Sequence, residues 1–488
     1  MKILFVSAEA APFIKTGGLG DVAGALPAAL AECDGCEVSV ILPLYGTIKE
    51  REGGSLSLLT SFCITSPLSE HYVGVFTKTV GRVTYYFIDN EFYFRRAGGP
   101  YGHGDDGARF VFFSHAVLEM IGRQDALPDI LHLNDWQSAA VAILLRAHYA
   151  TDPRYARLST VFTIHNVAYQ GKMPAAFGED CMGLSPDLAS RCIHDGCFNL
   201  MKGGILCADR VTTVSRTYAE ELRYAYFSHG LDGVLRSLPE GILGIVNGID
   251  TEIYNPKKDK HLPARYSADD LSGKTLCKRE LQRELGLPMR EDVPVFAIVS
   301  RLVAHKGMSL FACVLENILA MDIQMVVLGT GDGEYEAMFR EAEARHPDRL
   351  SVRLSFDTAL ASRIYGGSDF FLMPSESEPC GLSQQIAMRY GTVPVVRETG
   401  GLYDTVPALN PATMRGRGFT FHDYNPWHML DAVCRAVAFY GDTENFNRLR
   451  RRLLRLSLGW RNAAGEYISL YRELLACNIE KQKTKRKN

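Results

Sequence analysis

The sequence lacks the long apolar runs that cross a membrane. None of its 488 residues falls in an uninterrupted apolar stretch of about 20 residues. Its start, Met1–Ser7, has one basic residue and a short apolar run, without the longer apolar segment and small-residue cleavage site of a signal peptide. Net charge is also nearly absent, at −3 from 53 basic and 56 acidic residues, which does not favour a nucleic-acid polyanion. We therefore expect no membrane and no nucleic acid among its partners.

The cysteines show no paired framework. The twelve are scattered, and Cys63, Cys207, Cys313 and Cys434 lie in apolar segments, which predicts buried thiols in a reducing, cytoplasmic compartment. Cys33-Asp-Gly-Cys36 is a lone pair with no second pair and no nearby histidine. We interpret it as a structural turn rather than a zinc or redox site.

Several cofactor motifs are missing as well. The chain has neither the phosphate-binding G-x-x-x-x-G-K-[ST] nor the zinc-binding H-E-x-x-H. Its first strand leads into Lys15-Thr-Gly-Gly-Leu-Gly-Asp21 rather than G-x-G-x-x-G, and Gly329-Thr-Gly-Asp-Gly333 lacks the third glycine at the required place. We expect no cofactor and no metal, and a dinucleotide-dependent oxidoreductase is disfavoured.

What the chain does contain is a regular alternation of strands and helices. Hydrophobic content of 47% and charged content of 22% are ordinary for a globular protein. Short, continuous apolar runs predict strands buried on both faces, hence parallel sheets covered by helices in an α/β fold. The predicted strands are 3–7, 38–42, 83–88, 130–133, 160–164, 210–214, 242–246, 295–299, 324–328, 351–354, 370–373 and 393–396, and helices are expected at 22–30, 137–147, 308–320 and 426–439.

A break near Asn247–Asp250, followed by the polar stretch Thr251–Ser272, divides the chain into two α/β halves. Residues 481–488 form a basic tail that we expect to be disordered. Lys15-Thr-Gly-Gly-Leu-Gly-Asp21 recurs as Glu398-Thr-Gly-Gly-Leu-Tyr-Asp404, so each half offers a Gly-Gly turn before a helix.

Ligands of open parallel sheets bind beyond the carboxyl ends of the strands. There, Gly17 and Gly18 precede an apolar helix, where free N–H groups favour an anion, and Lys15 adds a positive charge. A plain strand-to-helix turn is the alternative. In the second half, Arg301 and Lys306 share the loop after a strand and can stabilise a diphosphate leaving group, although two basic residues in a loop are often only solvated.

Glu378, beyond the strand 370–373, can hold sugar hydroxyls or offset positive charge at an anomeric carbon. The alternative is a cap for the helix expected from Leu382. His165 follows another strand, and as a single histidine it can equally be structural.

These motifs resemble, in order and over nearly the whole chain, those of bacterial glycogen synthases and plant starch synthases. The matching segments are Ser7–Pro12, Lys15–Val22, His165–Gly171, Thr212–Ser215, Val246–Asp250, Arg301–Gly307, Glu378–Leu382, Thr399–Val406 and Trp460. The resemblance implies a GT-B fold, in which two Rossmann-like domains face each other across a deep cleft and a C-terminal helix crosses back. The corresponding ranges are 1–248 on the acceptor side, 249–460 on the nucleotide-sugar side, and 461–480 for the helix.

The resemblance also implies a retaining transferase that needs no metal, with ADP-glucose as donor and the non-reducing end of glycogen, an α-1,4-glucan, as acceptor. The implied catalytic residues are Glu378, His165, Lys306 and Arg301. The implied substrate-binding residues are Lys15, Gly17, Gly18, Asp21, Asp135, Asn247, Phe356, Thr399, Gly400 and Gly401. In this scheme Arg301 and Lys306 neutralise the diphosphate, Thr399–Gly401 give it backbone N–H groups, and Asp135, His165, Asn247 and Glu378 surround the glucosyl unit.

Three positions depart from the family pattern. Asn134-Asp-Trp-Gln137 stands where many members have His-Asp-Trp-His, and Ile386 stands where many related retaining transferases have a second glutamate. Phe356 replaces a common tyrosine at the expected adenine-stacking position; it keeps the π face but loses a hydroxyl.

Two mechanisms remain open: front-face substitution, in which the departing phosphate takes the acceptor's proton, and a covalent intermediate on Glu378. The alternative functions are a transferase that uses UDP-glucose and an inactive glucan-binding homologue. The sequence leaves a homo-oligomer open.

Overall fold

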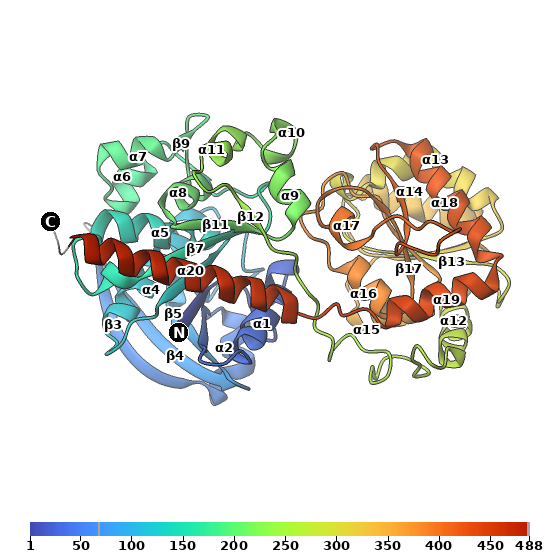
Figure 1. Ribbon diagram of the computed structural model, residues 1–488, viewed down its shortest axis with the longest axis horizontal. Coiled ribbons are helices and arrows are strands. Elements are labelled where there is room, and N and C mark those ends of the chain that lie inside the picture. Colours follow the sequence, from blue (N-terminus) through green and yellow to red (C-terminus); the bar gives the residue numbers. More distant parts are fainter. Residues whose placement is uncertain (67–68, 486–488) are drawn as a thin grey trace. The chain divides into compact units, whose positions relative to one another are not determined.

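The computed structural model describes residues 1–66 and 69–485, which divide into two compact units (Figure 1). Unit 1 is Met1–Asn247 together with the chain from Trp460 onward, and unit 2 is Gly248–Gly459. These bounds lie one residue from the predicted domain ends at 248 and 460.

The sheet of unit 1 has the strand order β12-β11-β7-β6-β1-β2-β5-β4-β3. The strands are β1 (Lys2–Val6), β2 (Glu37–Pro43), β3 (Ser57–Ser66), β4 (Ser69–Val80), β5 (Val83–Asp89), β6 (Ile130–Asn134), β7 (Ser159–Ile164), β11 (Arg210–Thr213) and β12 (Leu243–Gly244). All neighbours from β12 to β5 are parallel. The strand predicted at 242–246 is shorter than expected.

One edge of the sheet in unit 1 is antiparallel, which the sequence analysis did not predict. β4 runs antiparallel to β5, and β3 runs antiparallel to β4. Only Gly81 and Arg82 separate β4 from β5, and Gly81 has φ +59°. A connection this short can join antiparallel strands only, because a parallel pair needs a crossover of a dozen or more residues.

Helices cover both faces of this sheet (Figure 1). They are α1 (Gly18–Ala31), α2 (Gly46–Glu52), α3 (Glu91–Phe94), α4 (Asp106–Gly122), α5 (Trp136–His148), α8 (Leu200–Cys207), α9 (Arg216–Glu221), α10 (Ala225–Ser228), α11 (Asp232–Arg236) and α20 (Arg461–Lys485). Unit 1 also contains a smaller antiparallel sheet of order β8 (Lys172–Met173), β10 (Cys197–Asn199) and β9 (Ile193–His194). The short helices α6 (Phe177–Met182) and α7 (Pro186–Arg191) lie between β8 and β9 in the sequence.

The C-terminal helix α20 packs on α1 and β7 of unit 1. Its side chains Tyr467 and Tyr471 are buried. The Tyr471 hydroxyl lies 2.6 Å from Nδ1 of His132 on β6, and Nε2 of His132 lies 2.6 Å from the Thr163 hydroxyl on β7. The helix continues to Lys485, five residues into the predicted basic tail; residues 486–488 lie outside the described part.

Unit 2 contains a parallel sheet of order β15-β14-β13-β16-β17-β18. Its strands are β13 (Val295–Val299), β14 (Gln324–Leu328), β15 (Leu350–Arg353), β16 (Phe370–Met373), β17 (Val393–Arg397) and β18 (Phe419–Phe421). Its helices are α12 (Ser272–Leu285), α13 (Met308–Ala320), α14 (Gly333–Arg345), α15 (Thr358–Gly367), α16 (Ser383–Arg389), α17 (Gly400–Thr405), α18 (Pro426–Tyr440) and α19 (Thr443–Leu454).

The cysteines differ in part from the prediction. Cys207 is buried, but Cys63, Cys313 and Cys434 are exposed. Cys63 lies on the edge strand β3, whose side chains alternate between the two faces, and the other two lie on the outer faces of amphipathic helices. Cys33 and Cys36 form the predicted turn, in which the Cys36 N–H donates to the Cys33 carbonyl at 3.2 Å.

None of the helices within the described ranges combines the length and apolarity that a bilayer crossing requires.

Candidate active site

Each sheet has a point where the strand order reverses, and the predicted site residues follow the strands there. In unit 1, β1 has β2 on one side and β6 on the other; in unit 2, β13 has β14 on one side and β16 on the other. Connections leave in opposite directions at such a point, which opens a crevice at the carboxyl ends of the strands.

In unit 2, the loops that follow β13 and β16 meet through a charged pair. Lys306 Nζ lies 2.6 Å from Glu378 Oε2, and both side chains are largely buried, at 18% and 8% exposure. The Ser375 hydroxyl donates to the same oxygen at 3.0 Å. Both bonds go to Oε2, so Glu378 Oε1 has no hydrogen-bond partner among the described residues. The carboxylate therefore does not cap α16, the structural alternative considered for it.

Two close backbone approaches hold these loops together. Gly307, with φ +84°, lies against the Pro374 carbonyl, which a Cβ would meet at 2.3 Å. The Gly401 N–H donates to the Glu378 carbonyl at 3.0 Å, and a Cβ on Gly401 would lie 2.1 Å from the Cys380 carbonyl oxygen. Glycine is required at both positions because no side chain fits there.

Two N–H groups of the second Gly-Gly turn, which the resemblance assigns to the diphosphate, form hydrogen bonds within the protein. The N–H of Thr399 donates to the Arg397 carbonyl at 3.0 Å, and that of Gly401 is engaged by Glu378. In this structure, the Gly401 N–H joins the loop after β17 to the loop after β16, and the Thr399 N–H is engaged by the end of β17 itself. Gly400, with φ +43°, lies between them.

The cationic character of the β13 loop comes from side chains. Arg301 is exposed, and burial together with the charges of Lys306 and Arg301 lowers the pKa of His305 in the same loop. A neutral His305 leaves Arg301 and Lys306 as the charged donors of this loop. Phe356 follows the edge strand β15 and is 82% exposed, so its ring face is open to solvent.

In unit 1, the first Gly-Gly turn is fastened by a buried carboxylate. Glu9 is 3% exposed and accepts hydrogen bonds from the backbone N–H and hydroxyl of Thr16, the latter at 2.8 Å, and from the Tyr101 hydroxyl at 2.6 Å. Lys15 forms an ion pair with Asp21 at 2.7 Å. Asp21 therefore holds the ammonium group of Lys15 in this structure. Gly17 is the N-cap residue of α1, which begins at Gly18.

Asp135 and His165 lie at the ends of the neighbouring strands β6 and β7. Asp135 Oδ1 accepts the backbone N–H of His165 at 2.8 Å and that of Asn166 at 3.3 Å. His165 Nε2 lies 2.9 Å from Asn134 Oδ1. Asp135 has φ +55° and ψ −178°, a conformation that costs non-glycine residues about 1–3 kcal/mol.

Burial sets the protonation states of both side chains. Removal from water raises the pKa of Asp135 from 3.8 to about 7, against the effect of its two N–H donors and with a further upward contribution from the Glu9 charge. Burial lowers the pKa of His165 from 6.5 to about 3. His165 is therefore neutral at physiological pH, whereas Asp135 gains or loses its proton close to that pH.

Both units of the chain match models of known protein families. Residues 2–237 match the family model "Starch synthase catalytic domain", and residues 280–446 match "Glycosyl transferases group 1". A glycogen synthase of Exiguobacterium sibiricum is 46% identical over 477 residues, covering 97% of this chain and 99% of that protein. The chain belongs to the glycogen and starch synthase family.

Other members of the glycogen and starch synthase family agree. A glycogen synthase of Ligilactobacillus salivarius is 44% identical over 97% of this chain and the full length of that protein. The solved catalytic domain of starch synthase IV from Arabidopsis thaliana, bound to ADP and acarbose, is 34% identical with a TM-score of 0.88, and covers 97% of this chain and 99% of that one. The predicted family and GT-B fold are thus confirmed, and the chain is a glycosyltransferase.

The sequence analysis missed three polar residues that support the site. Glu9 and Tyr101, which hold the first Gly-Gly turn, and Ser375, which holds Glu378, were not among the predicted site residues. Glu9 lies in the family motif Ser7–Pro12, so a carboxylate in an otherwise apolar segment was a usable signal. Asn247, which was predicted, is buried close after β12.

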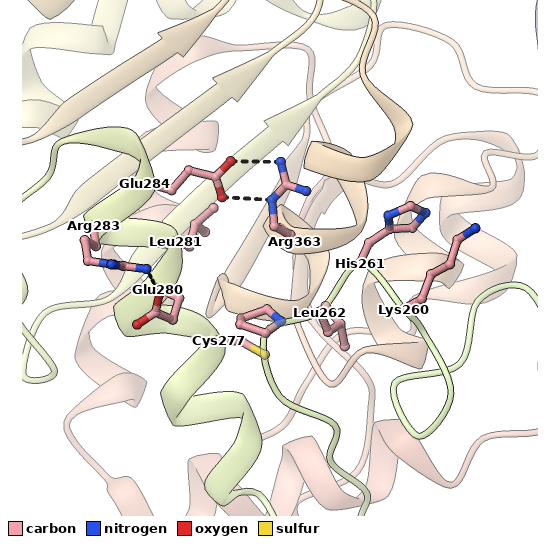
Figure 2. A pocket seen from close by; sticks show the side chains of 10 residues that line it. Lys260, His261, Leu262, Cys277, Glu280, Leu281, Arg283, Glu284 and Arg363 are labelled. Atoms are coloured by element: carbon pink, nitrogen blue, oxygen red, sulfur yellow. Dashed lines mark hydrogen bonds and ion pairs between the residues drawn. The ribbon is translucent and has the colours of Figure 1, made fainter.

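A separate hollow on unit 2 is not part of this site. It has a volume of about 600 Å³ and is lined by α12, the segment 260–263 and Arg363 of α15 (Figure 2). Arg363 forms two 2.8 Å bonds to Glu284, and Arg283 pairs with Glu280. None of the residues lining it belongs to the loops after β13, β16 or β17.

Proposed function

We propose that this chain transfers a glucosyl unit from ADP-glucose to the non-reducing end of an α-1,4-glucan, with retention of the anomeric configuration. The observation that carries the proposal is the Lys306–Glu378 pair at the strand-order reversal of unit 2, in a chain that matches glycogen synthases over its whole length. The Arabidopsis relative is described as bound to ADP, and ADP is the group that leaves when ADP-glucose is the donor.

The arrangement suits a reaction in which charge separates. As the bond between the anomeric carbon and the phosphate breaks, negative charge grows on the diphosphate and positive charge grows on the sugar. Lys306 and the exposed Arg301 supply fixed positive charge for the leaving group, and fixed charges of this kind cost no reorganisation during the reaction. Since Thr399 and Gly401 already use their N–H groups, we assign diphosphate stabilisation to these two side chains.

Glu378 serves better as an electrostatic partner of the sugar than as a nucleophile. Its Oε2 is bonded to Lys306 and Ser375, and charge-assisted bonds of this kind draw electron density from a carboxylate. We therefore favour front-face substitution, in which a departing phosphate oxygen takes the proton of the acceptor hydroxyl. Exclusion of water is then needed, because water in place of the glucan would hydrolyse the donor.

The test is transfer of radiolabelled glucose onto glycogen from ADP-glucose and, separately, from UDP-glucose. We expect ADP-glucose to be the better donor and Lys306→Ala to lower kcat by about 10²–10³-fold, the usual effect of removing one transition-state donor. Lys258→Ala is the control, because Lys258 is an exposed lysine paired with Glu252 on the same unit. Better transfer from UDP-glucose would overturn the donor assignment; no transfer from either would favour an inactive glucan-binding protein.

We also propose that the protein works in the cytoplasm. The cysteines within the described ranges are all free thiols, which suits a reducing compartment.

A further inference from the structure

Asn134 stands where many family members have a histidine, and the structure gives this side chain a specific task. Its Nδ2 donates to the carbonyl of Val6 on β1 and to that of His132 on β6, both at 3.1 Å. A carbonyl oxygen can only accept, so the amide nitrogen must face these two groups. The amide oxygen, Oδ1, therefore faces His165.

This orientation decides which ring nitrogen of His165 carries the proton. Asn134 Oδ1 can only accept, and it lies 2.9 Å from His165 Nε2, so Nε2 must be the donor. With its pKa lowered to about 3 by burial, the ring carries a single proton. Nδ1 is then a lone-pair acceptor, and it has no hydrogen-bond partner among the described residues.

The unusual backbone of Asp135 makes the arrangement geometrically feasible. In a regular strand, successive side chains point to opposite faces, so residues 134 and 135 would not both reach one neighbour. With φ +55° at Asp135, the carboxylate of Asp135 bonds the backbone of His165 while the carboxamide of Asn134 bonds its ring. The end of β6 thus fixes His165 at two places.

We propose that Asn134 is a positioning residue that holds His165 as its neutral Nε2–H tautomer, so that Nδ1 accepts a hydrogen bond from a hydroxyl group of the bound glucosyl unit. A carboxamide is suited to this task because its oxygen accepts a hydrogen bond from the ring N–H without adding the negative charge that would favour the imidazolium form. The role of Asn134 in turnover rests on the proposed function, whereas the assignment of the Nε2–H tautomer does not depend on it.

The first experiment measures the tautomer in the unmodified protein. Long-range ¹H–¹⁵N correlation spectra distinguish a protonated ring nitrogen from a lone-pair nitrogen, and loss of signals in His165→Ala assigns them among the 13 histidines. We expect Nε2 protonated and Nδ1 unprotonated at pH 7. An Nδ1–H tautomer or an imidazolium would overturn the proposal, whatever the enzyme's activity. In Asn134→Ala, the preference for Nε2–H should be lost; its full retention would also refute the assignment.

The second experiment is a double-mutant cycle in kcat with ADP-glucose and glycogen. We expect Asn134→Ala to lower kcat about 10- to 100-fold, since a misplaced reacting geometry has effects of this size. In a His165→Ala background the same substitution should change kcat less than about twofold, because its effect passes through His165. Equal effects in both backgrounds would show that Asn134 acts by another route. Absence of transfer by the unmodified protein would refute the proposed function and leave the tautomer result standing.

Discussion

Asp135→Asn should stabilise the protein at neutral pH while lowering its activity. In the folded chain, burial raises the pKa of Asp135 from 3.8 to about 7. The folded state therefore binds this proton more tightly than the unfolded state does, so stability falls as the pH rises from about 4 to about 7. Asparagine keeps an oxygen that can accept the His165 N–H and has no charge to bury, so the variant escapes this loss.

The stability difference between the wild type and Asp135→Asn depends on how far the pH rises toward the pKa of Asp135 in the folded protein. One pKa unit corresponds to about 1.4 kcal/mol, so between pH 5 and a folded pKa of about 7 the wild type loses up to about 2.7 kcal/mol relative to the variant. For a large domain, about 1 kcal/mol shifts Tm by about 2–4 °C. Because the side chain keeps partial contact with solvent, we expect the Tm advantage of Asp135→Asn to grow by about 5 °C from pH 5 to pH 8.

The assay is thermal unfolding of both proteins across this pH range, with kcat measured in parallel. Asp105→Asn is a control of opposite sign: hydrogen bonding to the Arg96 guanidinium lowers the pKa of Asp105, so its charge stabilises the fold above its unfolded pKa, and the variant should be the less stable protein at pH 8. A difference in Tm between wild type and Asp135→Asn that stays constant from pH 5 to pH 8 would refute the reasoning.

Three further variants test other parts of the site. Arg301→Lys should raise the KM for ADP-glucose about tenfold with little change in Tm, since lysine cannot form the bidentate fork to phosphate; an unchanged KM would remove Arg301 from donor binding. Phe356→Ala should raise the same KM about 5- to 10-fold by loss of a stacking face, and Phe356→Tyr should not; because the ring is 82% exposed, Tm serves as the check that neither change acts through folding. Gly401→Ala should lower kcat by at least tenfold, because the added Cβ would meet the Cys380 carbonyl oxygen at 2.1 Å and displace the segment bonded to Glu378. Gly333→Ala, with open space around the added Cβ, is its control, and equal kcat values in these two variants would contradict the packing argument.

The strands of unit 2 were predictable because their sequences are uninterrupted apolar runs. β13, β14 and β16 have the bounds expected from sequence, and every residue of β14 is buried. The antiparallel strands β4 and β3, the last two of the sheet in unit 1, were missed for the opposite reason. β3 mixes serine and threonine with apolar residues and is half exposed, so it lacks that signal, although the two-residue connection at Gly81 was a usable sign of an antiparallel pair.

The pairing of Lys306 with Glu378, 72 positions apart, was within reach of sequence because both residues follow strands of one parallel sheet. Three details of the site could not be predicted from the sequence. The amide orientation of Asn134 depends on carbonyls from two strands, the left-handed backbone of Asp135 has no sequence signature, and the occupation of the Gly401 N–H depends on how closely two loops approach. Each follows from backbone geometry that a linear motif does not encode.

The attachment of α20 to unit 1 has a consequence for how the protein is made. Tyr471 completes the buried contacts of His132, yet the ribosome reaches Tyr471 only after it has synthesised all of Gly248–Gly459. Unit 1 cannot complete its packing during this time, and the surface that α20 will cover stays exposed to water. Unit 2 is contiguous in the sequence, so all of its residues are already synthesised by then. The unit that begins first is therefore the last to be finished, and a nascent chain stalled before Trp460 would display that uncovered surface to chaperones.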